Sequence, residues 1–436
     1  MWLRVPRLAH DLAWLGLVVI CSGSSLAQAL TLDQLTVHAL TLDQLTVHAL
    51  NQHPATQAAA YEVQANRHEV EVARLARWPV FSATHDNYWN DRRTVFSLRQ
   101  PLWDGGAIQS RIRQAETQVS QSQAAVLLQR QQIAQRVLSA WSDYYTALYR
   151  QQLIQQQLAQ LQDYAALMQR RVDAGVSAAI EQQLVLSRIQ QTRVDEQVAV
   201  AIQAVARDRL TRLTGLPQVD QLLDLSSFDQ QLVAVLQASA LLPTFAATAA
   251  QAAQQHPSVL GADYAIEAAQ AVIVTQQAER WPRVYLQYQH RIDYPQANID
   301  DLGIAVGVEF STDRSLGSWI SSKSAQSRLQ AAEASRQATL ELINDDLIST
   351  YQQIISLQPR LTALQRAVES ARLVQASYTR QFSAGHKSWL EVLNALRETA
   401  QTEQALAEAQ VDLVGLNFKL RMDQGLMDWQ QITSTP

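Results

Sequence analysis

One uninterrupted helical pattern, from Gly106 to Val172, limits the folds open to this chain more than any other feature. Apolar or small residues recur three and four positions apart along it, which is the spacing of a helix with one buried seam. The pattern contains no proline, and glycine occurs only at its ends. At about 1.5 Å per residue the helix would be ~100 Å long, whereas helices of globular domains rarely exceed ~25 residues. The pattern therefore predicts a rod or the wall of a tunnel.

The long pattern ends in the turn Asp173-Ala174-Gly175-Val176-Ser177, and a second helical pattern follows over about 177–214. Two long helices joined by a short glycine-containing turn form an antiparallel hairpin with one exposed tip. The glycine has a structural explanation, because glycine is the usual residue where a helix stops in the left-handed conformation.

The start of the chain has the parts of a secretory signal peptide over 1–29. A positively charged beginning precedes a short apolar core, and Ala27-Gln28-Ala29 forms a cleavage site. Cys21 would fit a lipoprotein signal only after a small residue, and Ile20 is not one. We therefore expect export with cleavage after Ala29. The mature chain then has no cysteine, so it has no disulfide and no thiolate metal site.

Residues 31–40 and 41–50 are the same decapeptide, Thr-Leu-Asp-Gln-Leu-Thr-Val-His-Ala-Leu. Each copy opens with Thr followed three positions later by Gln, a capping box that can start a helix. One copy is enough to begin the first helical segment, over 42–77. We assign the other copy no function.

A longer repeat divides the chain into two homologous halves. The corner Gln52-His53-Pro54 returns as Gln255-His256-Pro257, and Arg77-Trp78-Pro79 returns as Arg280-Trp281-Pro282, each 203 residues later. The hairpin turn also returns, with Arg171 and Gly175 matched to Arg380 and Gly385. Internal symmetry of this kind decides the fold.

The repeat fixes the expected organisation. We place the first half in 30–214, a linker in 215–244, the second half in 245–425 and a tail in 426–436. The long helices of the second half are expected over about 320–381 and 387–424.

Each half also holds two strand-like runs, over about 80–100 and 283–310. In the second half apolar and polar side chains alternate, as in Leu286-Gln287-Tyr288-Gln289. The first half is less regular, with a tight turn expected at 90–93. If these strands enter a membrane they must form a closed barrel, and the smallest such barrels have about eight strands. Four strands per chain therefore require several copies for closure.

Composition excludes several classes of function. The net charge is −5 over 436 residues, so the chain lacks the basic footprint of a nucleic-acid-binding protein. We find no phosphate-binding glycine loop, nucleophile elbow or metal-binding spacing. The sequence predicts a protein that is not an enzyme and that uses no cofactor or metal.

These features together resemble the TolC-like outer-membrane factor family. The resemblance rests on the ordered set, and above all on Gln100-Pro101-Leu102-Trp103-Asp104-Gly105-Gly106 and the two glycine turns. It implies a mainly α fold with a small β part, built from long antiparallel α-hairpins. Three protomers would form one twelve-stranded β-barrel in the outer membrane, continued by an α-helical tunnel through the periplasm. A periplasmic adaptor and an inner-membrane pump would dock at the tips Gly175, Val176, Ala384 and Gly385.

The resemblance also implies roles at the periplasmic entrance. Lys387 stands where the family has a linking Arg, and Glu181 stands where it has the acidic partner. Phe382 replaces a hydrogen-bonding Tyr, so one tether is expected to be absent. Glu391 and Asn394 occupy two acidic-ring positions, and only the first is acidic. Alternatively, Lys387 and Glu391 are solvated charges, an exposed pair worth ~0–1 kcal/mol.

Three functions remain open at this point. The first is a passive exit duct of a tripartite efflux or type I secretion system. The second is a periplasmic coiled-coil interaction protein without a channel, and the third is a damaged paralogue. The sequence selects no cargo and does not distinguish a proton-driven pump from an ATP-driven one.

Overall fold

The computed structural model describes residues 40–88, 91–239, 242–294, 301–310, 312–425 and 427. The expected signal peptide, Cys21, residues 31–39 of the first decapeptide copy and the tail beyond Met427 lie outside these ranges.

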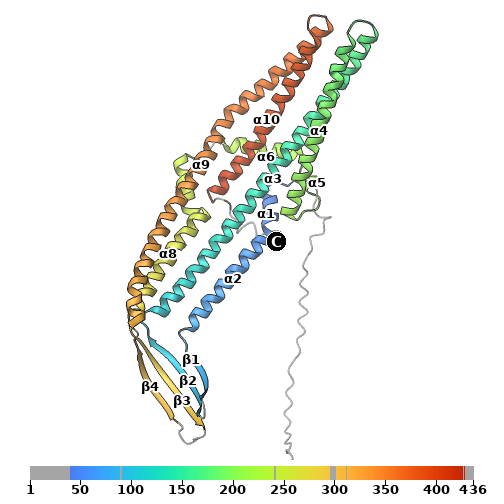
Figure 1. The fold of residues 1–436 in the computed structure, drawn as a ribbon. Coiled ribbons are helices and arrows are strands. Elements are labelled where there is room, and N and C mark those ends of the chain that lie inside the picture. The colour runs from blue at the N-terminus through green and yellow to red at the C-terminus, as the bar shows by residue number, and fades with distance from the viewer. Residues whose placement is uncertain are drawn as a thin grey trace, which may run out of the picture. The chain divides into compact units, whose positions relative to one another are not determined.

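The order of elements repeats once along the chain, as Figure 1 shows. Both halves read helix, helix, strand, strand, long helix, long helix. The first two helices have the same lengths in each half, 11 and 22 residues. The first half comprises α1 (Leu42–Gln52), α2 (Pro54–Leu75), β1 (Val80–Tyr88), β2 (Asp91–Trp103), α3 (Ala107–Asp173) and α4 (Ala179–Thr214). The second half comprises α7 (Phe245–Gln255), α8 (Pro257–Ala278), β3 (Arg283–Tyr294), β4 (Asp301–Glu309), α9 (Thr312–Ser383) and α10 (Trp389–Asp423).

Two boundaries differ from the expectation. The turn expected at 90–93 is wrong, because β2 begins at Asp91 and pairs with β1 from there. Arg93 lies directly across from Asp86, and its guanidinium donates to that carboxylate at 3.4 Å, a cross-strand pair that favours the longer ladder. The last long hairpin also starts earlier, since α9 begins at Thr312 instead of about 320.

The four strands form one antiparallel sheet in the order β1-β2-β3-β4, so β2 and β3 join the two halves. Phe81, Leu98, Tyr288 and Ile304 pair in a row and therefore share one face. That face is open to solvent in the single chain, with Phe81 66% and Ile304 73% exposed. One position along, the row is polar or small: Ser82, Ser97, Gln289 and Gly303. The register confirms the predicted alternation and extends it to the first half.

The long helices pair as two hairpins. α3 packs against α4 and α9 packs against α10, while α2 and α8 cover α3, and α8 also packs on α9 (Figure 1). No helix in the described ranges combines the length and the apolar composition that a membrane span requires.

The segment between the halves contributes to the core. It forms α5 (Val219–Leu222) and α6 (Leu225–Ser239). Phe228 of α6 is fully buried against Trp141 and Tyr145 of α3, with ring centroids 5.7 and 5.1 Å away. The expected linker is therefore packed onto the middle of the long helix.

Candidate functional site

The two hairpin turns have the same backbone geometry. In the first, the N–H of Gly175 donates to Val172 and that of Val176 donates to Arg171. In the second, Gly385 donates to Phe382 and His386 donates to Gln381. Each pair is a Schellman motif, which satisfies the last carbonyls of a helix and needs a left-handed residue.

Glycine supplies that conformation in both turns. The φ angles are 72° at Gly175 and 79° at Gly385, in the left-handed region that residues with a Cβ rarely adopt.

The hydrogen bonds of the two turns also correct the alignment of the repeat. Arg380 corresponds to Arg170 rather than to Arg171, because each accepts the N–H of the alanine before the glycine.

Side chains pack tightly behind the second turn. Trp389, at the start of α10, is 1% exposed, and its ring lies 5.0 Å from Phe382 and 5.3 Å from Tyr164 of α3. The guanidinium of Arg171, at the end of α3, lies 4.8 Å from the Phe382 ring centroid. Phe382 is therefore buried between the two hairpins and ties their ends together.

The second turn also carries a network of charged groups. Lys387 donates to Oε1 of Glu391 at 2.6 Å, and its ammonium lies 4.5 Å from the ring centroid of Tyr378. Oε2 of Glu391 accepts the N–H and the hydroxyl of Ser388, each at 2.9 Å. The hydroxyl in turn accepts the N–H of Glu391, which completes a capping box at the start of α10.

These contacts set the charge state at the tip. The Lys387 ammonium, followed by the Ser388 N–H, lowers the pKa of Glu391 to about 2. The Glu391 carboxylate raises the pKa of Lys387. Both groups are therefore charged at neutral pH.

Two other residues predicted for the entrance lie on α10 and α4. Asn394 is exposed on α10, about one turn beyond Glu391, and Glu181 is half-buried in the first turn of α4. The predicted Lys387–Glu181 link joins neighbouring hairpins, and a single chain does not test it. Within this chain Lys387 contacts Glu391. The link therefore stays a prediction.

The residues predicted for docking are available at the surface. Val176 is 63% exposed, and Ala384 is also exposed. A Cβ added at Gly175 or Gly385 would meet no atom within 4 Å. A partner could therefore approach the backbone of both turns.

Sequence reasoning missed Trp389, Ser388 and Arg171. The Ser388…Glu391 spacing is a readable capping box. No local signal assigns Arg171 to an aromatic ring 211 residues further along the chain.

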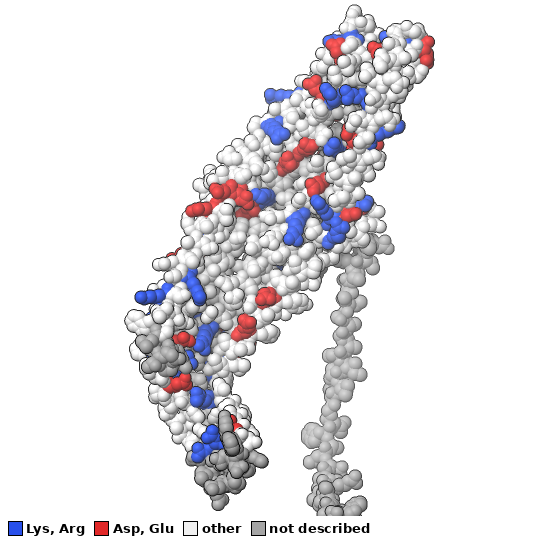
Figure 2. All heavy atoms as spheres, in the orientation of Figure 1, with Lys and Arg blue, Asp and Glu red and all other residues white. Residues whose placement is uncertain are grey.

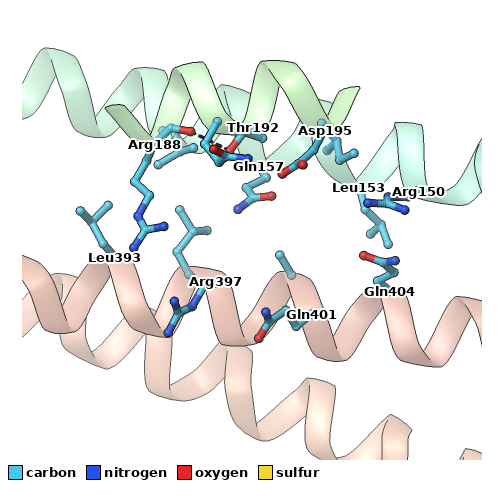
Figure 3. Close-up of a pocket in the computed structure, with 15 residues that line it drawn as sticks. Arg150, Leu153, Gln157, Arg188, Thr192, Asp195, Leu393, Arg397, Gln401 and Gln404 are labelled. Atoms are coloured by element: carbon cyan, nitrogen blue, oxygen red, sulfur yellow. Dashed lines mark hydrogen bonds between the residues drawn. The ribbon is translucent and has the colours of Figure 1, made fainter. Parts of the chain in front are cut away.

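A groove of about 300 Å³ separates the two hairpins behind the tips. Arg150 of α3, Arg188 of α4 and Arg397 of α10 line it together with glutamines, as Figure 3 shows. The groove between α3, α9 and α10 is crossed by direct bonds instead. There Gln375 donates to Gln160 at 2.8 Å, and the hydroxyls of Tyr164 and Thr379 lie 2.9 Å apart. Grooves therefore lie on both sides of the contact between the hairpins. One is crossed by direct hydrogen bonds, and the other is lined by three arginines and Asp195.

Acidic and basic side chains are interspersed along the face of the molecule shown in Figure 2. Among the described residues, no group of three or more His, Cys, Asp or Glu could hold a metal ion.

Solved structures with the same fold include outer-membrane proteins. The outer-membrane channel OprN aligns with a TM-score of 0.74 at 18% identity, covering 89% of this chain and 90% of its own. The outer-membrane protein VceC of Vibrio cholerae aligns with a TM-score of 0.71 at 17% identity, covering 88% and 96%. At this identity the likeness establishes the fold.

Two relatives are similar over most of the chain. The alkaline protease secretion protein AprF of Pseudomonas aeruginosa is 23% identical over 410 residues, which are 86% of this chain and 82% of AprF. The outer membrane efflux protein BepC of Brucella suis is 21% identical over 345 residues, which are 77% of this chain and 72% of BepC.

A family profile described as outer membrane efflux protein matches residues 45–216 and 248–419. The two matches coincide with the two halves, which confirms the internal duplication. Efflux proteins of this kind are not enzymes, in agreement with the expectation from the sequence. Because the matches cover most of the chain, it belongs to the outer membrane efflux protein family.

Proposed function

We propose that this chain is the outer-membrane exit duct of a tripartite efflux or type I secretion system. The observation that carries the proposal is one sheet with an exposed apolar face, joined to two long helical hairpins. An apolar face flanked by a polar one suits a wall between lipid and water. The hairpins would extend this wall into the periplasm.

Barrel closure sets the oligomeric state in this proposal. Each protomer supplies four strands, and β1 and β4 are edges in the single chain. Unpaired edges are not stable in lipid. Three protomers pairing edge to edge would give twelve strands and leave no free edge. The same arrangement would place the helical hairpins in a ring.

The hairpin tips are the proposed docking surface for a periplasmic adaptor and an inner-membrane pump. They are exposed, and no other atom crowds the backbone of the glycine in each turn. They lie at the end of the hairpins away from the sheet (Figure 1). Transport through the duct would be passive, with energy and cargo choice supplied by the pump. One relative is named for protease secretion and another for efflux. In this proposal the inner-membrane partner therefore selects the cargo.

Two adjacent residues on β4 test the membrane assignment. Val306 lies on the apolar face and is 64% exposed, whereas Ala305 lies on the other face. We expect Val306→Arg to reduce trimers in the outer-membrane fraction, because an Arg on the lipid face costs roughly 2–4 kcal/mol at mid-membrane. Ala305→Arg should leave fractionation unchanged. Equal fractionation of both variants would favour the alternative, a periplasmic coiled-coil interaction protein.

Single-channel conductance in planar bilayers tests the entrance. We expect a small conductance that rises in Lys387→Ala and loses its cation selectivity in Glu391→Ala. Glu398→Ala, about two turns further along α10, is the control and should behave as the unaltered protein. Well-folded trimers that give no channels would overturn the duct, and channels unaffected by both tip changes would overturn only the entrance roles.

A further inference from the structure

The corner between the first two helices of each half is built in the same way. His53 ends α1 and begins α2, and His256 ends α7 and begins α8. In both corners Nδ1 of the histidine accepts a backbone N–H and caps the second helix, from Ala55 at 3.1 Å and from Ser258 at 3.2 Å.

A left-handed glycine at the end of a long helix closes each corner. Gly215 follows α4 and Gly425 follows α10. A Cβ added at Gly215 would collide with the side chain of Gln52, and one added at Gly425 would collide with Gln255. Aligning the two glycines places Leu213 of the first half opposite Asp423 of the second. The second corner therefore has a carboxyl group where the first has an apolar side chain.

Asp423 joins a buried chain of three polar side chains. The amide nitrogen of Gln131, on α3, lies 3.1 Å from Nε2 of His256 and 3.2 Å from Oδ1 of Asp423. Asp423 and Gln131 are each 4% exposed, and His256 is 7% exposed. The amide oxygen of Gln131 has no hydrogen-bond partner, and the second oxygen of Asp423 has only the Lys419 ammonium, at 3.5 Å. At such depth the positions of the hydrogens are strictly constrained.

Counting hydrogens shows that this arrangement depends on a proton. A neutral imidazole carries one N–H, and its other nitrogen accepts. Nδ1 of His256 accepts from Ser258, so the ring hydrogen is on Nε2 and needs an acceptor on Gln131. The oxygen and nitrogen of the Gln131 amide must then exchange places relative to the orientation in the structure, in which the nitrogen faces both groups. The exchanged oxygen is then the atom 3.2 Å from Oδ1 of Asp423, and two oxygens at that distance need a hydrogen between them. Only a protonated Asp423 supplies it.

Ionisation of Asp423 forces the opposite arrangement. Gln131 then turns its NH₂ toward the carboxylate and also toward the ring. The ring must accept at Nε2 and carry its hydrogen on Nδ1, where it can no longer accept the N–H of Ser258. The cap of α8 is lost.

We propose that the His256–Gln131–Asp423 chain is a proton-linked latch at the α7–α8 corner. With a proton on Asp423 the chain caps α8 and ties it to α3 and α10, and loss of that proton releases the cap. The latch joins the C-terminal end of α10 to the α8 N-terminus, while the other end of α10 begins at the hairpin tip.

Two charged groups near Asp423 have opposite effects on its ionisation. Lys419, on α10, lies 3.5 Å from Oδ2 of Asp423 and favours its ionised form. Asp346, on α9, lies 3.9 Å from the Lys419 ammonium and opposes ionisation. From α3 the adjoining cavity receives only Leu128 and the amides of Gln131, Gln132 and Gln135.

Burial decides the balance of these effects. It raises the pKa of Asp423 in spite of Lys419, and it lowers the pKa of His256 to about 4, so the ring is neutral at physiological pH. A carboxyl whose pKa is raised in the folded state stabilises the fold in its protonated form. That contribution is present below the unfolded pKa and is lost as the pH rises through the folded pKa.

Hydrogen exchange at the two corners of the same molecule tests the latch. The readout is the exchange rate at the start of α8 divided by the rate at the start of α2, because α2 has the same histidine cap without a carboxyl group. We expect the ratio to rise about fivefold as the pH rises through the titration of Asp423, the factor that a helix cap of typical strength gives. In Asp423→Asn, whose NH₂ replaces the proton, the ratio should stay at its low value.

Two further variants keep the test decisive. Asp346→Asn alters the exposed carboxylate beside Lys419 and should retain the rise in the ratio. His256→Asn keeps a capping side chain but removes the ring hydrogen, so its ratio should not depend on pH even if Asp423→Asn fails to fold.

Infrared spectroscopy follows the proton itself. We expect a protonated-carboxyl band in the unaltered protein that persists above pH ~5, where an ordinary aspartate is ionised, and that is absent from Asp423→Asn. The proposal is overturned if Asp423→Asn shows the same rise in the exchange ratio as the unaltered protein, or if no such band is found.

Discussion

The two hairpin tips have one backbone and two kinds of packing. Both end in a Schellman turn with a left-handed glycine. Behind the second, Phe382 and Trp389 are buried, and Ser388 and Glu391 cap the next helix. Behind the first, Ala178 offers no capping side chain, and Val176 and Ile180 are 63% and 65% exposed. Tip geometry is thus set locally by glycine, whereas the packing behind the second tip also uses Tyr164 and Arg171 of the other hairpin.

In the proposed duct this difference would give the two tips distinct tasks. The second is packed around buried aromatic rings and carries the Lys387–Glu391 ion pair, whereas a side-chain hydrogen bond at the first joins Arg171 to Ser177. The first presents apolar side chains that no described residue covers. In the proposed duct, the second tip would hold the entrance in shape and the first would be the more adaptable contact for a partner.

The largest expected effect on stability comes from removing the packing behind the second tip. Trp389→Ala should lower the free energy of unfolding by ~3–5 kcal/mol, because a fully buried ring leaves a cavity. Ile180→Ala is the matched change at the first tip and should stay within about 0.5 kcal/mol, as exposed sites do. Chemical denaturation followed by circular dichroism measures both. Similar losses would mean that the first tip is also covered in the assembled protein.

The next effect tests what the tips share. Gly175→Ala and Gly385→Ala should each cost roughly 1–2 kcal/mol, because a Cβ is strained in the left-handed conformation. Open space around both glycines excludes a steric contribution. Thermal melting of the two variants should give equal shifts. Unequal shifts would show that the turns are not equivalent in solution.

A smaller effect is expected when the capping serine is removed from the second tip and a serine is introduced at the first. Ser388→Ala should cost ~1 kcal/mol, the usual value of a lost N-cap. Ala178→Ser, at the matched position before α4, should stabilise the first tip by up to a similar amount. Denaturation midpoints decide the sign for each variant, and a destabilising Ala178→Ser would refute the equivalence of the two positions.

The smallest effect depends on pH. The pKa of Glu391 is lowered to about 2 by Lys387 and Ser388, so its stabilising contribution is present above the ordinary glutamate pKa and is lost as the pH falls toward 2. The difference in Tm between the unaltered protein and Glu391→Gln should therefore shrink between about pH 4.5 and pH 2. At the matched position, Glu181→Gln removes a carboxylate for which the described residues give no ion pair, so we expect a smaller change. A difference that grows in acid would contradict the assignment.

Much of the fold could be predicted because its signals are local and repeated. A seam of apolar residues three and four apart identifies a long helix wherever it occurs, and Gly175 and Gly385 mark where the long helices turn. The prediction of a turn at 90–93 was wrong. The strand there depends on the pairing of Arg93 with Asp86 on the opposite strand, which no local signal shows. The candidate site was predicted only at the level of its position at the tips.

The sequence alone determined the helical hairpins, the duplicated halves and the alternating strands, because spacing along one chain decides which face an element buries. Only the tertiary structure decided which side chains meet. Arg171 stacks on Phe382 from the other hairpin, and Asp423 is hydrogen-bonded to a glutamine 292 residues away. Such contacts depend on burial and on the positions of hydrogens between elements, and no pattern along the chain contains that information.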